Sequence, residues 1–171
     1  MNVRKLTISA LLTALALALS YVERFIPLNL LVPLPGIKLG LANVVTLFSL
    51  FSLGPGYALG ILISRCLLGA LFGGSVSSLF FSLSGGILAF IVMLVSMKLR
   101  IFSVFGVSVL GAAAHNTGQI LAATILMDST ALWGYLPLLL LTACFTGIIT
   151  ALMAQAVIRT VPSSVISGKT T

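Results

Sequence analysis

The sequence predicts an all-α, polytopic membrane protein: a bundle of six transmembrane helices that forms a single integral membrane domain over residues 1–171. Composition is the first reason, because only 6% of the residues are charged and 60% are hydrophobic, whereas a soluble domain carries roughly a quarter charged residues. Length is the second reason, because 171 residues hold five or six spans of about 20 apolar residues each. These observations exclude soluble enzymes and secreted disulfide modules.

Turn and charged residues divide the apolar sequence, and this pattern is the third reason. Residues 23–38 contain Pro27, Pro33 and Pro35, which prevent a regular helix. Because this loop is nevertheless apolar, we expect it to pack on protein or to cover a cavity. The six predicted spans are residues 6–22, 39–53, 57–72, 76–97, 104–127 and 132–158.

Glycine, proline and small polar residues mark the boundaries between the later spans. Residues 54–56 read Gly-Pro-Gly and form a tight turn, residues 73–74 are a glycine pair, and a second pair at 85–86 interrupts the fourth span. Lys98 and Arg100 mark a polar loop. Residues 128–130 are expected to form a turn with an N-cap for the sixth helix.

The distribution of charge orients the predicted bundle. Six spans place both termini on one side of the membrane, and six basic residues share that side, against two on the other. Since basic residues accumulate in cytoplasmic loops, both termini are expected in the cytoplasm of a cell-membrane protein. The terminal side carries Arg4, Lys5, Lys98, Arg100, Arg159 and Lys169. The opposite side carries Arg24 and Lys38, together with both acids of the chain, Glu23 and Asp128.

The net charge of +7 does not indicate nucleic-acid binding, because the basic residues are scattered between apolar runs instead of clustering to neutralise phosphates. Cys66 and Cys144 lie inside apolar runs, without a CxxC or Cys/His ligand spacing. No metal site, redox motif or cofactor site is therefore predicted.

Polar residues from three predicted helices gather in the outer half of the membrane. Arg65 lies nine residues past Gly56, which is roughly 13 Å along the third helix. Intramembrane ionisable residues are functional candidates by default. The cluster is predicted to line an outward-facing binding cavity, with Lys38 at its rim. The candidate substrate-binding residues are Lys38, Asn43, Arg65, His115, Asn116 and Gln119.

Two interpretations of this cluster stay open at the level of sequence. Asn, Gln and His often join transmembrane helices by hydrogen bonds worth about 1 kcal/mol each, and His115 fits a neutral, packed imidazole equally well. Arg65 either pairs with Glu23 or awaits an anionic ligand, since a guanidinium binds carboxylate or phosphate in bidentate fashion.

Motifs for chemistry on nucleotides or diphosphates are absent from the sequence. There is no GxxxxGK[ST] nucleotide-binding motif. There is also no paired acidic motif of the DDxxD kind, which would hold the Mg²⁺ that diphosphate chemistry needs. We therefore expect the chain not to be an enzyme.

Two motifs resemble those of a small bacterial membrane family. Residues 35–43 read PGIKLGLAN and precede Gly54-Pro55, and residues 114–119 read AHNTGQ. They resemble the second-helix and fifth-helix signatures of the Gx transporter family, often labelled heptaprenyl diphosphate synthase component I. That family is similar to the substrate-binding S-components of energy-coupling-factor (ECF) transporters, which have six helices and cytoplasmic termini.

The resemblance implies a substrate-capture subunit of an ECF-type importer. By that similarity, Ala10, Ala14 and Ala18 would dock on a transmembrane coupling subunit, and two ATPase subunits would supply the energy. The cargo would be a small anionic or amphipathic metabolite, with an isoprenoid or quinone precursor as one candidate. The alternatives are a non-catalytic accessory subunit of a heptaprenyl diphosphate synthase, and a structural membrane protein whose polar residues only join helices.

Overall fold

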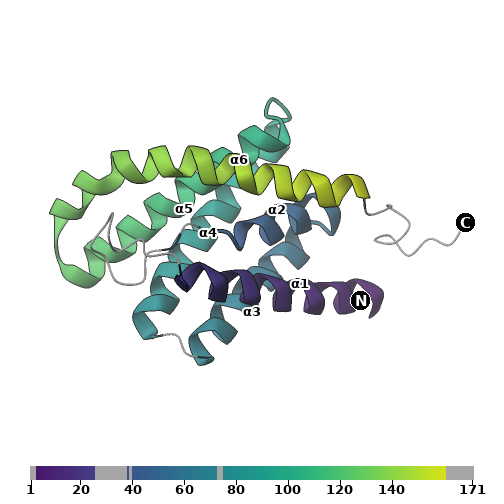
Figure 1. Cartoon of the computed structure of the whole chain (residues 1–171), viewed down its shortest axis with the longest axis horizontal. Helices are drawn as coiled ribbons and strands as arrows, with labels where there is room; N and C mark the ends of the chain where they lie inside the picture. Colours follow the sequence, from purple (N-terminus) through teal and green to yellow (C-terminus); the bar gives the residue numbers. More distant parts are fainter. Residues whose placement is uncertain (1–2, 26–37, 39, 73–74, 161–171) are drawn as a thin grey trace, which may run out of the picture.

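A computed structural model of the chain describes residues 3–25, 38, 40–72 and 75–160, except for the side chain of Arg24. The described residues are helical apart from turns and short connections, as the predicted all-α class requires. Within these described residues, two 3₁₀ helices accompany six α-helices (Figure 1). The elements are α1 (Val3–Val22), η1 (Glu23–Phe25), α2 (Asn43–Ser52), α3 (Pro55–Leu71), α4 (Val76–Leu99), α5 (Val104–Met127), η3 (Thr130–Tyr135) and α6 (Leu136–Thr160).

The helices begin and end where local chemistry favours it. Ser75 and Ser103 cap α4 and α5, since their side chains accept hydrogen bonds from the backbone N–H groups of Ser78 and Gly106. Helix α4 ends at Arg100 and α5 ends at Asp128, both in the left-handed conformation. Asp128 therefore closes α5 in the turn where a cap for the next helix was expected.

Helix α4 runs without a break through Gly85 and Gly86, in contrast to the predicted interruption. The glycines serve packing, because they let neighbours approach the helix closely. A Cβ atom on Gly85 would lie 2.9 Å from the His115 ring, and one on Gly86 would lie 3.3 Å from the Leu62 side chain. The sixth predicted span also differs, since it divides into η3 and α6.

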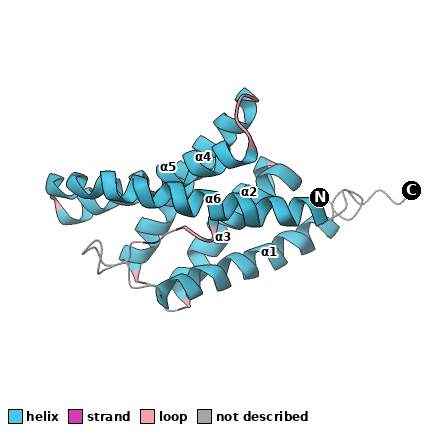
Figure 2. Ribbon diagram, turned by 45° about the horizontal axis from the view of Figure 1, so that its top comes forward, coloured by secondary structure: helices cyan, strands magenta, loops and turns pink. Residues whose placement is uncertain are grey.

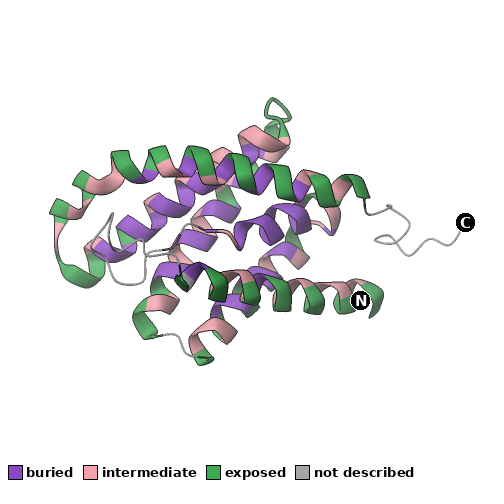
Figure 3. Cartoon of the chain, in the orientation of Figure 1, coloured by how far each residue is buried: buried purple, intermediate pink, exposed green. Residues whose placement is uncertain are grey.

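Helix α2 lies at the centre of the bundle and is buried on all sides along residues 43–50. One core cluster joins Leu47 of α2 to Leu62 of α3, Met93 of α4 and Val107 of α5. Figure 3 shows buried residues along α2 and the inner faces of α4 and α5, with exposed residues dominating α1 and α6. The buried residues of α2 include three polar ones, Asn43, Thr46 and Ser49, beside the apolar majority.

The outer helices expose large apolar side chains, including Leu11 and Leu15 on α1 and Phe145 and Leu152 on α6. Such surfaces are unusual on a soluble protein, and they suit contact with lipid. In the part of the chain that the structure describes, three segments are long and apolar enough to cross a membrane: Val3–Val22, Val76–Leu99 and Thr130–Thr160. Membrane association is thus supported, and the count of six spans stays a prediction.

The short helices explain why fewer spans qualify than were predicted. Helix α2 has 10 residues, about 15 Å, which is half the thickness of a bilayer core of about 30 Å. Helix α5 is as long as α4 but carries polar side chains along its buried face. The first turn of α1 and the last turn of α6 lie at the same end of the bundle (Figures 1 and 2), as an even number of crossings would require. A cytoplasmic location for both ends stays a prediction.

Candidate functional site

Arg65 is a buried cation on α3, with only 6% of its surface exposed. Its guanidinium donates to the Ser20 hydroxyl at 3.4 Å and to the Asn43 side-chain oxygen at 3.5 Å. Both partners are neutral, and both hydrogen bonds are long. The Arg65 Nε atom is buried without a partner. Burying a charge is costly unless it is paired and hydrogen-bonded, so the unpartnered Nε leaves this side chain with hydrogen-bonding capacity for an anion.

Glu23, the acid considered as a partner for Arg65, is engaged elsewhere. Its carboxylate accepts hydrogen bonds from the backbone N–H groups of Gly40 and Leu41, at the entry to α2. Gly40 has a φ of +85°, which glycine adopts without strain. Burial raises the pKa of the Glu23 carboxyl, while the hydrogen bond from Gly40 and the charges of Lys38 and Arg65 oppose that rise. Glu23 thus holds the chain that leads into α2.

Lys38 is fixed in place by Gln119 of α5. The Lys38 backbone N–H donates to Gln119 Oε1 at 2.9 Å, and Gln119 Nε2 donates to the Lys38 carbonyl at 3.0 Å. The Lys38 ammonium donates to the Ser82 hydroxyl on α4 at 2.7 Å. Gln119 therefore sets the position of a second cation by binding its main chain, across 81 residues of sequence.

His115 lies in the packed interior between Gly40 and Gly85. Its Nε2 is in hydrogen-bonding contact with Gln119 Nε2, and its Nδ1 has no partner. Gln119 contacts both His115 and the main chain of Lys38, so it lies between these two residues. The position of His115 matches the packed imidazole considered as an alternative from sequence.

Asn116 joins two helices. Its side-chain amide donates to the Leu139 carbonyl of α6 at 2.7 Å. Asn116 thus points toward α6, whereas Arg65 bonds to α1 and α2, and Lys38 bonds to α4. This geometry is typical of an interhelical hydrogen bond.

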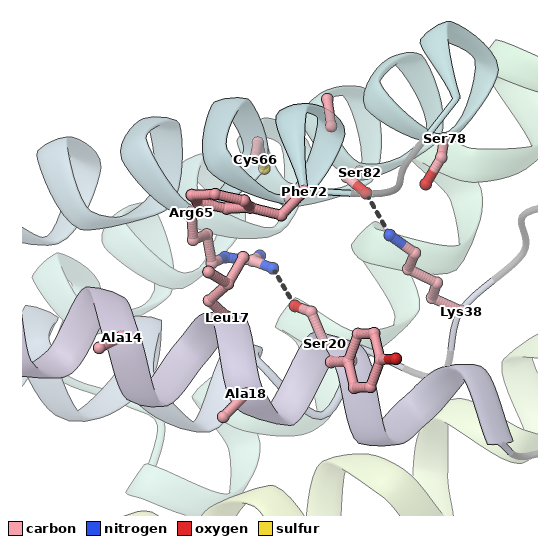
Figure 4. Close-up of a pocket in the computed structure, with 13 residues that line it drawn as sticks. Ala14, Leu17, Ala18, Ser20, Lys38, Arg65, Cys66, Phe72, Ser78 and Ser82 are labelled. Atoms are coloured by element: carbon pink, nitrogen blue, oxygen red, sulfur yellow. Dashed lines mark hydrogen bonds between the residues drawn. The ribbon is translucent and has the colours of Figure 1, made fainter.

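A cavity of about 360 Å³ lies between α1, α3 and the start of α4. Figure 4 shows Arg65 and Ser20 pointing toward one another at one part of its wall, and Lys38 reaching Ser82 at another. Small and aromatic side chains complete the wall. The lining consists of Ala14, Leu17, Ala18, Ser20, Tyr21, Lys38, Arg65, Cys66, Gly69, Ala70, Phe72, Ser78 and Ser82.

The predicted site residues therefore occupy different places. Lys38 and Arg65 line the cavity, Asn43 contacts Arg65, and Gln119 positions Lys38, whereas His115 and Asn116 are absent from the lining. Four further lining residues, Ser20, Tyr21, Cys66 and Phe72, were not predicted from the sequence. Ser20 and Tyr21 follow Leu17 by three and four residues, so they lie on the same face of α1 as Leu17. This spacing could have identified them from the sequence.

The predicted docking stripe lies on the outside of the bundle. Ala10, Ala14 and Ala18 are all exposed on α1. Ala14 and Ala18 also line the cavity. A second hollow, of about 760 Å³, runs between α1 and α3 and includes Ala10, Ala14 and Gly60. The stripe is thus open to a partner.

Within the described ranges, no group of three or more His, Cys, Asp or Glu side chains could hold a metal ion. Cys66 is buried and Cys144 is exposed, and both are free thiols. The cavity lining carries cations and hydroxyl groups but no described acid. The polar part of this lining is therefore positively charged.

Fold and cavity together define a class: small, all-helical membrane proteins with a cation-lined cavity between their helices. The sequence model of one family, heptaprenyl diphosphate synthase component I, matches residues 12–157. The chain belongs to this family, which confirms the resemblance seen in the sequence. No curated protein and no solved structure gave a significant match.

Proposed function

We propose that the chain is the substrate-binding membrane subunit of an ECF-type importer and captures a small anionic or amphipathic metabolite at the outer face. The observation that carries the proposal is the buried guanidinium of Arg65 beside a cavity of about 360 Å³. A guanidinium with an unpartnered Nε suits carboxylate or phosphate. Lys38 adds a second positive charge to the same lining.

The partners in this proposal are a transmembrane coupling subunit and two ATPase subunits. Ala10, Ala14 and Ala18 give α1 an exposed surface of small residues, against which another helix can pack closely. Replacing Ala14 by Trp would fill that surface. Loss of uptake and of assembly in Ala14→Trp is the expected result, and unchanged uptake would count against this arrangement.

The proposed role is binding without catalysis. Diphosphate chemistry needs carboxylates that hold Mg²⁺. One of the two acids, Glu23, is occupied by backbone N–H groups, and the other, Asp128, closes α5. Neither lines the cavity.

Thermal stability of the purified chain, measured against a panel of vitamins, prenyl phosphates and naphthoquinone precursors, tests the proposal. A ligand at 100 times its dissociation constant stabilises by about 2.7 kcal/mol. The stabilisation should vanish in Arg65→Ala and persist in Arg159→Ala, a matched control at an exposed arginine of α6. A folded protein that no compound stabilises would contradict the proposal.

The second candidate is a membrane accessory subunit of a heptaprenyl diphosphate synthase. The description of the family favours it. This role predicts co-purification with a soluble prenyl synthase and a change of product length when the chain is added. Neither effect is expected of an importer subunit, so the two candidates separate cleanly.

A further inference from the structure

Two hollows adjoin along α1 and differ in chemistry. The cavity beside Arg65 carries two cations, whereas the larger hollow between α1 and α3 is lined mostly by small and apolar residues. The hydroxyl groups of Ser9 and Thr13 in its lining donate to backbone carbonyls of α1. The two hollows share Ala14 and Leu17. A polar compartment therefore opens beside an apolar groove, hereafter the α1–α3 groove, which extends along α1 from Leu17 to Leu6.

We propose that the ligand is a single-chain phosphate amphiphile, whose dianionic head lies between Arg65 and Lys38 and whose apolar chain lies in the α1–α3 groove. This inference rests on the proposed function and specifies its substrate class. In this proposal the α1–α3 groove binds the apolar chain of that ligand. The alternative occupant is the tail of an ordinary membrane lipid.

The head group follows from the donors of the cavity. Two cations, Arg65 and Lys38, meet the hydroxyl groups of Ser20, Ser78 and Ser82 in one lining. A phosphate monoester carries close to two negative charges and three acceptor oxygens, so it can match two cations and several hydroxyl donors at once. A carboxylate has one charge and two oxygens, and would leave part of this set unmatched.

The chain follows from the shape of the groove. Leu6 to Leu17 covers about 16 Å of helix, which suits an extended alkyl or polyprenyl segment. Gly60 lies in this groove, and a Cβ atom added to it would meet nothing within 4 Å. The groove is thus open where the chain would lie. A coupling subunit docked on Ala10 and Ala14 would cover it, since both residues line the groove.

Monoalkyl phosphates of different chain length test the inference on the full chain in lipid nanodiscs. Wild type should bind dodecyl phosphate about tenfold more tightly than butyl phosphate. This gain in affinity is smaller than the transfer of two methylene groups from water would give, because lipid already solvates the chain of the free ligand. Gly60→Leu should lose this preference and bind butyl phosphate as wild type does. Gly134→Leu is the matched control, since Gly134 also has open space around its Cβ position and lies outside the groove.

Each other outcome of these binding measurements would overturn a specific part of the proposal. Equal binding of butyl and dodecyl phosphate by wild type would assign the groove to ordinary lipid and leave the proposed function standing. A length preference that survives in Gly60→Leu would place the chain elsewhere. Dodecanoate binding as tightly as dodecyl phosphate would overturn the dianionic head. Binding of neither phosphate would overturn both this inference and the anion site. If Gly60→Leu does not fold, Gly56→Leu fills the same groove.

Discussion

Replacing Gly118 with alanine tests how closely α4 and α5 approach. A Cβ atom on Gly118 would lie 2.7 Å from the Ser84 carbonyl oxygen and 2.9 Å from the Gly85 Cα. Both neighbours are backbone atoms of a continuous helix, so neither can turn aside. Contact at 2.7 Å falls short of an ordinary separation of 3.4 Å by about 0.7 Å. The two helices must therefore move apart.

The cost follows from two terms. Overpacking a core costs typically 1–3 kcal/mol. The separation also stretches the hydrogen bond from the Ser84 hydroxyl to the Gly118 carbonyl, now 2.6 Å, and such interhelical bonds contribute about 1 kcal/mol. Gly118→Ala should thus lower the free energy of unfolding by roughly 2–4 kcal/mol, which corresponds to a melting temperature at least about 4 °C lower.

Thermal unfolding in detergent measures this effect. Gly60→Ala is the control, because a Cβ atom there meets nothing within 4 Å and alanine is the better helix former by about 1 kcal/mol. Gly60→Ala should melt at or above the wild-type temperature. A melting temperature for Gly118→Ala within about 1 °C of wild type would refute the close approach of α4 and α5.

Three further predictions concern buried polar residues that do not line the cavity. Asn116→Leu should cost about 1 kcal/mol of stability and leave ligand affinity unchanged, as thermal unfolding with and without ligand would show; a loss of affinity would contradict its assignment to the α5–α6 contact. Gln119→Leu should weaken anion binding several-fold by releasing the main chain of Lys38, with calorimetric titration as the measurement, and unchanged affinity would refute that positioning role. The stability of the folded protein should fall as the pH rises through the raised pKa of Glu23, because burial favours the protonated carboxyl in the folded state. In Glu23→Gln the melting temperature should depend less on pH. An identical pH dependence in both proteins would show that another group titrates.

Much of the fold could be predicted from sequence because the boundaries are local chemistry. Ser75, Ser103 and Arg100 lie at helix ends that hydropathy and charge had located within two or three residues. The continuity of α4 could not be predicted. Glycine is ambiguous in a helical pattern: it breaks a helix in isolation and permits close packing in a bundle, and only the position of His115 against Gly85 decides between the two.

The candidate site could be predicted in part. Arg65 stands out because a cation within an apolar span is rare, and the depth of the polar residues predicted that they would lie near it. Which of these polar residues line the cavity and which join helices could not be predicted, because this depends on how each helix is rotated about its axis. Gln119 faces Lys38 and Asn116 faces Leu139, although the two are only three residues apart. Sequence alone also left Glu23 as a partner for Arg65, and its contacts with Gly40 and Leu41 are set by a turn that hydropathy does not reveal.

In the proposed function, Arg65 binds an anion and does not contribute to the stability of the bundle. Unfolding of Arg65→Met without ligand, followed by titration with butyl phosphate, is the decisive test of this role. Because both hydrogen bonds of the buried Arg65 guanidinium are long and go to neutral partners, its burial is costly, and we expect a ligand-free stability equal to or above that of wild type, together with loss of phosphate binding. A fall in stability of about 3–5 kcal/mol, with phosphate binding retained, would contradict it and assign Arg65 to helix packing.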